Sequence, residues 1–189
     1  MGYAISWIAF EGKTATEVAD LLSLSPSGKF DEVPRDMFSG ARLDSGWYVV
    51  VIDKYAHKFV RARTLERVST ATGVIAATVE EHVMFSSAEA WKSGRLIWKI
   101  THEGENGPRN LKERGSLPAE YSPIKTRLLA AQQEEDAGTR EVDYFFDMPL
   151  DLAETITGYK HDKALAARFE ILKRGTSTVA GGLFSRLFR

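Results

Sequence analysis

Short, strongly apolar segments bounded by glycine and charged residues recur along this chain, and they constrain the fold more than any other feature. Residues 3–10 read YAISWIAF, and residues 47–52 read WYVVVI, an apolar run of six residues. Runs of this length predict strands that are buried on both faces, because a buried helix needs about ten residues or more. They also fall short of the roughly 20 residues that cross a membrane, so no membrane span is expected.

The clearest hairpin surrounds the segment Lys92-Ser93-Gly94-Arg95. Strand-like residues 89–91 and 96–102 flank it, and a four-residue connection that contains glycine is typical of a hairpin. Alternation then places four side chains of the second strand on one face: Leu96, Trp98, Ile100 and His102.

The other segments divide by the same criteria. Thr14 to Glu17 forms a capping-box pattern that starts one helix, Ser122 and Pro123 start another over 122–135, and Pro149 opens a third. We expect strands at 54–59, at 74–85 with an interruption at Glu80-Glu81-His82, and at 142–146. We also expect irregular structure at 26–46 and a surface loop at 104–118. Residues 163–173 fit a helix or a final strand, and we favour the strand.

Together these segments predict one α+β domain over residues 1–174. It has a mainly antiparallel sheet of about five to seven strands, with about three to four helices packed mostly on one face. Residues 175–182 have the Gly/Ser/Thr-rich composition of a linker, and residues 183–189, LFSRLFR, form a short amphipathic tail. Such a tail is suited to weak docking on a partner or a membrane surface.

Composition excludes several kinds of chemistry. The chain has 189 residues and no cysteine, so it has no disulfide framework, thiolate nucleophile or cysteine-ligated zinc. Hydrophobic residues make up 43% and charged residues 27%, which is typical of a folded domain. No leader-like segment opens the sequence, and we expect a cytoplasmic protein.

A net charge of −1 conceals blocks of opposite sign. Residues 132–162 hold nine acidic and two basic residues, whereas residues 163–189 hold six basic residues and one acidic residue. Acidic side chains next to aromatic anchors are typical of protein interfaces. The candidate partner-binding residues are therefore Trp91, Trp98, Asp143, Asp147 and Asp151.

No motif that carries a catalytic mechanism is present. The phosphate-loop pattern fails because Ser23 stands where the pattern requires a glycine and Phe30 stands where it requires a serine or threonine. The motifs GxGxxG, HExxH and GxSxG do not occur in the sequence either. We predict no metal and no cofactor, and enzymatic activity is disfavoured. If the protein is a small hydrolase or a metal-assisted enzyme, four residues are the candidates for acid–base work: His102, Glu103, Glu81 and His82.

A third interpretation is nucleic-acid binding through Lys58, Arg61 and Arg63. In an extended strand, alternation would place five side chains on one common face suited to stacking and phosphate contacts: Tyr55, His57, Phe59, Arg61 and Arg63. The isoelectric point near 6.4 and the lack of a known nucleic-acid motif argue against it.

The size, the lack of cysteine and the tryptophan-rich strands are similar to those of many small bacterial single-domain proteins. Some of these are immunity proteins that neutralise toxins. We therefore favour a non-enzymatic protein-binding module, immunity-like or regulatory, that acts through a charged and aromatic surface.

Overall fold

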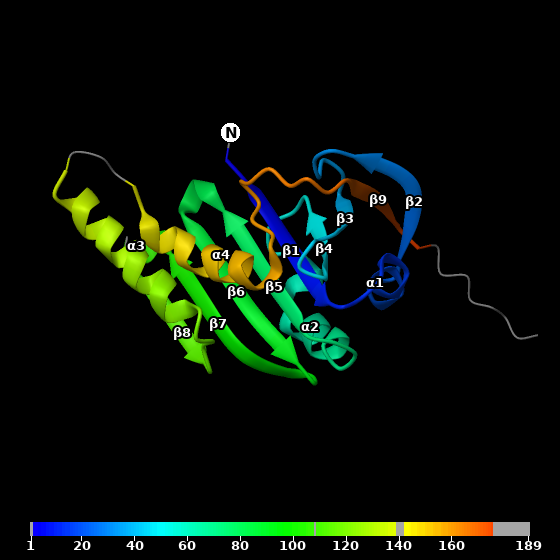
Figure 1. The fold of residues 1–189 in the computed structure, drawn as a ribbon, viewed down its shortest axis with the longest axis horizontal. Coiled ribbons are helices and arrows are strands. Elements are labelled where there is room, and N and C mark those ends of the chain that lie inside the picture. The colour runs from blue at the N-terminus through cyan, green and yellow to red at the C-terminus, as the bar shows by residue number, and fades with distance from the viewer. Residues whose placement is uncertain (1, 108, 139–141, 176–189) are drawn as a thin grey trace, which may run out of the picture.

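The protein, described over residues 2–107, 109–138 and 142–175 in a computed structural model, contains an antiparallel sheet of nine strands (Figure 1). The strand order is β2-β9-β3-β4-β1-β5-β6-β7-β8. The strands are β1 (Ala4–Glu11), β2 (Leu24–Asp31), β3 (Phe38–Arg42), β4 (Trp47–Ile52), β5 (Val74–Glu80), β6 (Phe85–Lys92), β7 (Arg95–Glu103), β8 (Leu111–Gly115) and β9 (Phe169–Arg174).

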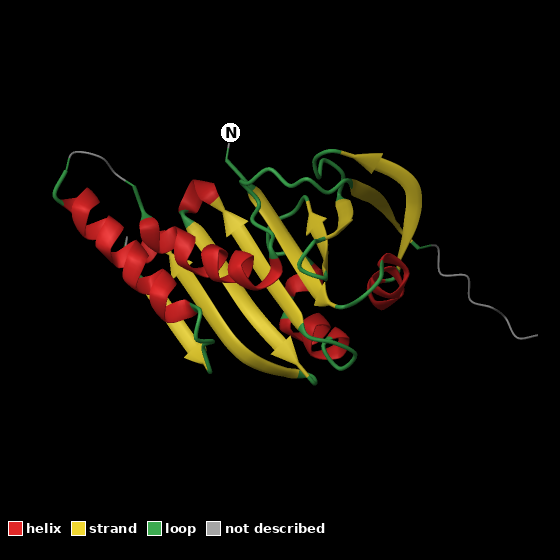
Figure 2. Ribbon diagram, in the orientation of Figure 1, coloured by secondary structure: helices red, strands yellow, loops and turns green. Residues whose placement is uncertain are grey.

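Helices cover both faces of this sheet (Figure 2). The two long helices, α3 (Tyr121–Asp136) and α4 (Tyr144–Thr157), pack on one face, and the short helices α1 (Ala15–Leu22) and α2 (Ala62–Val68) pack on the other. Three 3-10 segments complete the fold: η1 (Lys58–Val60), η2 (Glu81–Val83) and η3 (Gly104–Asn106). The expected helix content is present, and most helical residues do lie on one face.

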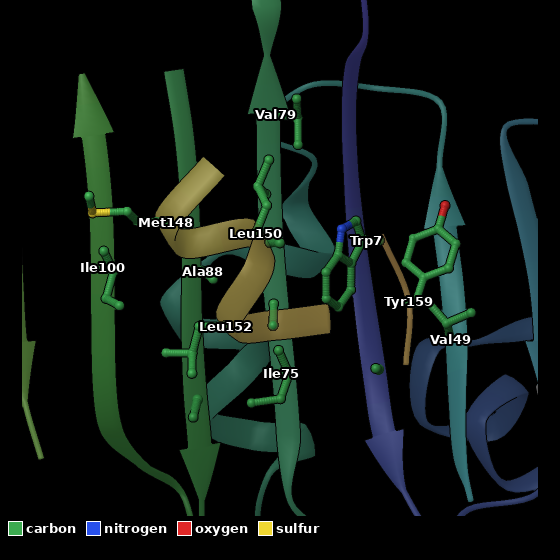
Figure 3. Packing of buried hydrophobic residues seen from close by; sticks show 14 of the residues in the cluster. Trp7, Val49, Ile75, Val79, Ala88, Ile100, Met148, Leu150, Leu152 and Tyr159 are labelled. Carbon is green, nitrogen blue, oxygen red and sulfur yellow. The ribbon is translucent and has the colours of Figure 1, made fainter. Parts of the chain in front are cut away.

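Alternation along the central strand β1 divides the apolar residues into two cores. Trp7 and Ala9 belong to the core beneath α3 and α4, whereas Ile8 and Phe10 belong to the core beneath α1 and α2. In the first core, Trp7 meets Tyr159 edge to face at 5.4 Å, and residues of α4 pack over β5, β6 and β7 (Figure 3). The expectation that this strand is buried on both faces is confirmed.

The hairpin and the last strand are present as predicted, but the expected four-residue connection Lys92-Ser93-Gly94-Arg95 is a two-residue turn. Strands β6 and β7 pair through Lys92 and Arg95, and the two central residues, Ser93 and Gly94, have φ of 52° and 72°. Positive φ at both positions is the feature of a type I′ turn, whose twist suits a hairpin. The ambiguous segment 163–173 ends as strand β9.

The sheet has more strands than expected, because two segments that resemble loops in sequence contribute strands to it. Residues 26–46 contain β3 and most of β2, and residues 104–118 contain β8. Both β2 and β8 are outermost strands, where proline and charged residues are tolerated because one side of the backbone needs no partner. Pro26 lies in β2 beside a register irregularity.

Two segments expected to be strands lie outside the sheet. Residues 142–146 begin α4, because the Asp143 carboxylate accepts hydrogen bonds from the backbone N–H groups of Phe145 and Phe146 and so caps the helix. Pro149 consequently lies inside α4 and does not open it. Residues 54–59 leave the sheet after β4 and form a turn and η1. The predicted amphipathic tail, 183–189, lies outside the described residues.

Candidate functional site

The candidate catalytic histidine, His102, is a structural residue of β7. Its ring is fully buried, Nδ1 donates to the carbonyl oxygen of Asn110 at 3.0 Å, and Nε2 lies 2.9 Å from Oδ2 of Asp143. The same Asp143 caps α4. His102 therefore links the start of α4 to the sheet.

The other three catalytic candidates each have a different partner. Glu103 contacts Lys112 at 2.7 Å, and this hydrogen bond holds the pKa of Glu103 below its usual value. Glu81 accepts from the backbone N–H of Tyr3 at 2.8 Å, and Nδ1 of His82 lies 2.9 Å from Glu80. These residues make no hydrogen bond or ion pair with one another within the described part of the chain.

Glu81 instead approaches a histidine that the sequence analysis did not select. Nε2 of His161 lies 3.5 Å from Oε1 of Glu81, which is long for a hydrogen bond. The His161 ring is almost buried, and burial lowers its pKa. His161 and Tyr159 line a hollow of about 400 Å³ of mixed charge. No sequence pattern links residues 81 and 161.

The acidic residues chosen as partner contacts are already compensated within the molecule. Lys160, whose side chain is 7% exposed, lies 2.8 Å from Oδ1 of Asp147 and 2.9 Å from Oδ1 of Asp151. Arg127 contacts the other oxygen of Asp151 at 2.6 Å. Burial opposes the charge of Lys160, but the hydrogen bonds to both aspartates outweigh it and raise the pKa of Lys160. We call Lys160, Asp147, Asp151 and Arg127 the paired cluster.

The two candidate aromatic anchors differ in exposure. Trp98 is 3% exposed and lies in the core beneath α3 and α4, so its side chain offers no surface contact. Trp91 is half-buried, and its indole N–H donates to Glu89 at 2.8 Å. Only Trp91 of this pair can present part of its ring to a partner.

The basic residues that we considered for nucleic-acid binding, Lys58, Arg61 and Arg63, do not lie along a strand. The backbone turns at Ala56, which has a positive φ of 47°, an unusual conformation for a residue other than glycine. Ser6 holds this turn: its hydroxyl donates to the carbonyl of Lys54 at 2.9 Å and accepts from the backbone N–H of His57 at 3.3 Å. The predicted common face of residues 55–63 is therefore wrong.

The turn instead brings basic side chains around a hollow of about 330 Å³, which we call the basic pocket. Its lining consists of four cationic residues, one histidine and two uncharged residues: Lys54, Lys58, Arg61, Arg174, His57, Met37 and Ala56. Arg63, the remaining nucleic-acid candidate, lines a separate hollow beside Glu66 and Arg67. Arg174 enters from the end of β9, so no local sequence pattern could have placed it here.

The four cations of the basic pocket have no counter-ion in the described residues. Elsewhere on the molecule, many lysine and arginine side chains lie within 4 Å of a carboxylate oxygen. Lys54, Lys58, Arg61 and Arg174 form no such pair within the described ranges, and the lining includes no Asp or Glu. The pocket therefore concentrates uncompensated positive charge.

His57 lies at the base of this arrangement and is 5% exposed. Its ring packs against Phe38 and Phe59, with centroids 5.4 and 4.6 Å away. Nδ1 accepts from the backbone N–H of Phe59 at 3.2 Å, so the ring proton resides on Nε2. Burial, and then the charges of Lys58, Arg174, Lys54 and Arg61, lower the pKa of His57 to about 4. At neutral pH the ring is an uncharged hydrogen-bond donor.

This arrangement is suited chemically to holding an anion. Ammonium and guanidinium groups bind anionic oxygens strongly, and a fixed N–H donor adds direction. Within the described ranges, no group of three or more His, Asp or Glu side chains converges as a metal site would require. In the same part of the chain, no helix is long and apolar enough to cross a membrane.

Comparison with known proteins adds no relative: no family model, curated protein or solved structure matches this chain.

Proposed function

We propose that this protein is a non-catalytic binding module that captures an anionic group of a partner protein in the basic pocket. One observation carries the proposal: Lys54, Lys58, Arg61 and Arg174 surround a single hollow that no carboxylate lines within the described residues. Like charges gathered without counter-ions oppose folding, so an anion that enters gains attraction from all four.

This proposal keeps the protein partner expected from the sequence but moves its contact surface. Asp143, Asp147 and Asp151 remain candidate contacts, yet each is already engaged by His102, Lys160 or Arg127. A basic partner would have to compete with those contacts. An anionic partner meets no such competition at the basic pocket. An immunity-like or regulatory role would be the consequence of this capture.

The two alternatives have less support. A hydrolase around His102, Glu103, Glu81 and His82 would need these groups to reach one substrate, whereas each is held by a separate partner. Of the three residues expected to bind nucleic acid, Lys58 and Arg61 line the basic pocket, whereas Arg63 lines a separate hollow. The three residues therefore do not form one binding surface.

Retention on a heparin column in a sodium chloride gradient tests the proposal. The pocket variant is Lys58→Glu/Arg61→Glu. The matched control is Lys29→Glu/Arg95→Glu, which changes the net charge equally at two exposed residues outside the pocket. We expect the pocket variant to elute roughly 100 mM salt earlier than the control, because local charge governs binding to a polyanion.

Thermal melts of both variants establish that they are folded. Equal elution of the pocket variant and the control, or flow-through of the unmodified protein at low salt, would overturn the proposal.

A further inference from the structure

We propose that the basic pocket is specific for a phosphate monoester dianion and that Nε2–H of His57 donates to one of its oxygens. This inference rests on the proposed function, because it names the anion that the same pocket captures. Phosphoserine and phosphothreonine side chains and free phosphorylated metabolites share this chemistry.

Charge density is the first argument. A phosphate monoester carries about −1.5 to −2 at neutral pH, whereas a carboxylate or a nucleic-acid diester carries about −1 per group. In the paired cluster, two cations, Lys160 and Arg127, are matched by two aspartates at hydrogen-bond distance. The basic pocket gathers four cations around one hollow without any acid in its lining. A compact dianion offsets this charge better than a single carboxylate does.

The second argument is the neutral donor. With Nδ1 occupied by the backbone N–H of Phe59, Nε2 carries the ring proton, and no hydrogen bond engages it within the described part of the chain. Phe38 and Phe59 fix the ring plane. Phosphate oxygens accept hydrogen bonds in several directions, and a rigid N–H beside mobile lysine and arginine side chains supplies one defined contact.

The lining of the pocket argues against a nucleic acid. Its volume of about 330 Å³ is at the lower end for ligand pockets, so the lining rather than the volume decides the argument. Besides its charged residues and His57, the lining consists of Met37 and Ala56. No Phe, Tyr or Trp from the described residues is available there for a base to stack on, as single-stranded nucleic-acid sites require.

Binding of methyl phosphate and dimethyl phosphate to the unmodified protein gives the sharpest test, because the two ligands differ by one methyl group and one charge. Calorimetry should show methyl phosphate binding about tenfold more tightly, since the second charge adds attraction to every cation of the pocket. In NMR titrations, methyl phosphate should raise the pKa of His57, because a nearby anion favours the charged imidazole.

Two variants test the residues. His57→Phe keeps the ring between Phe38 and Phe59 but removes the donor, and we expect methyl phosphate to bind about tenfold more weakly. Arg174→Gln should weaken binding similarly, whereas its neighbour Lys173→Gln, which is exposed and outside the pocket, should not. The Arg174 pair keeps the test decisive if His57→Phe does not fold.

A serine-phosphorylated hexapeptide, its unmodified form and an oligonucleotide with unphosphorylated ends distinguish the sources. Tighter binding of the phosphopeptide than of methyl phosphate supports a protein-borne group. Equal binding supports a free metabolite, which agrees with a phosphate monoester site but contradicts the partner protein of the proposed function. Binding of the oligonucleotide as tightly as methyl phosphate, or equal affinity for methyl and dimethyl phosphate, would overturn it. In those cases heparin retention through the pocket could still stand, so failure here is separable from failure of the proposed function.

Discussion

The paired cluster on α4 and the basic pocket beside η1 both concentrate charged side chains, but they differ in how that charge is balanced. The paired cluster balances it with ion pairs, whereas the basic pocket has no carboxylate among its described lining residues. Lys160 is 7% exposed and is hydrogen-bonded to Asp147 and Asp151, and Arg127 completes the set. The basic pocket leaves its cations exposed to water and without carboxylate partners in the described residues. One cluster is complete without a ligand, whereas the other gains its counter-charge only when something binds.

This difference separates structural charge from charge that is available for binding. The sequence shows an acidic block at 132–162, yet its central aspartates are used internally. The basic residues at 54–61 are fewer, but their geometry leaves them available. Pairing in space, rather than the number of charges along the chain, distinguishes the two.

Breaking the paired cluster should have the largest effect. Lys160→Met leaves two aspartates without their shared cation, and we expect a loss of about 3 kcal/mol in the free energy of unfolding, measured by urea denaturation. The control is Lys163→Met, because Lys163 is 57% exposed and pairs with Glu154 at the surface. That variant should lose less than about 0.5 kcal/mol. Similar losses in the two variants would contradict the distinction.

Lowering the pH should next test the basic pocket. The pKa of His57 is about 4 in the folded protein and near 6.5 when unfolded, so between these values the unfolded chain binds more protons. The contribution of His57 to stability is complete above pH 6.5 and is lost as the pH falls towards 4. We expect about 2 kcal/mol of pH-dependent stability, seen as the difference between the unmodified protein and His57→Phe. Parallel pH profiles for the two proteins would refute this assignment.

The smallest effect concerns the turn that forms the pocket. Ala56 has a φ of 47°, which glycine adopts more easily. Because glycine also increases the entropy of the unfolded chain, we expect Ala56→Gly to stabilise the protein by only about 0.5 kcal/mol. Ala130→Gly, at an exposed position of helix α3, should instead destabilise it by about 1 kcal/mol. In thermal denaturation, the melting temperature should rise for Ala56→Gly and fall for Ala130→Gly. A lower melting temperature in both variants would exclude strain at Ala56.

Local patterns predicted the elements whose stabilising contacts are local. The hairpin around Ser93-Gly94 and the capping box at Thr14 and Glu17 were recognisable because a few neighbouring residues determine them. The edge strand β2 was not, because Pro26 and Gly28 indicate a loop and only pairing with the distant β9 makes this segment a strand. The start of helix α4 was predicted as a strand, because its three consecutive aromatic residues favour a strand. These residues are helical because Asp143 caps the N-terminus of α4.

The candidate site was predictable only in part. Lys58 and Arg61 are predicted from the sequence as contacts for phosphate groups, and this remains a prediction, whereas the strand expected to carry them is wrong. His57 was visible as a neighbour, whereas its orientation depends on Ser6 and Phe59. Arg174 comes from 113 positions beyond Arg61, and only the sheet topology places both at one hollow.

The position of β9 between β2 and β3 has a consequence for synthesis on the ribosome. During translation, β2 emerges more than a hundred residues before β9, the one strand that pairs with it in the described part of the chain, so β2 lacks this partner until residues 169–174 leave the exit tunnel. Because β9 also delivers Arg174, a shortened polypeptide lacking this segment would lose both the anchorage of β2 and one wall of the pocket. Anion capture in the basic pocket would thus require translation to have passed residue 174.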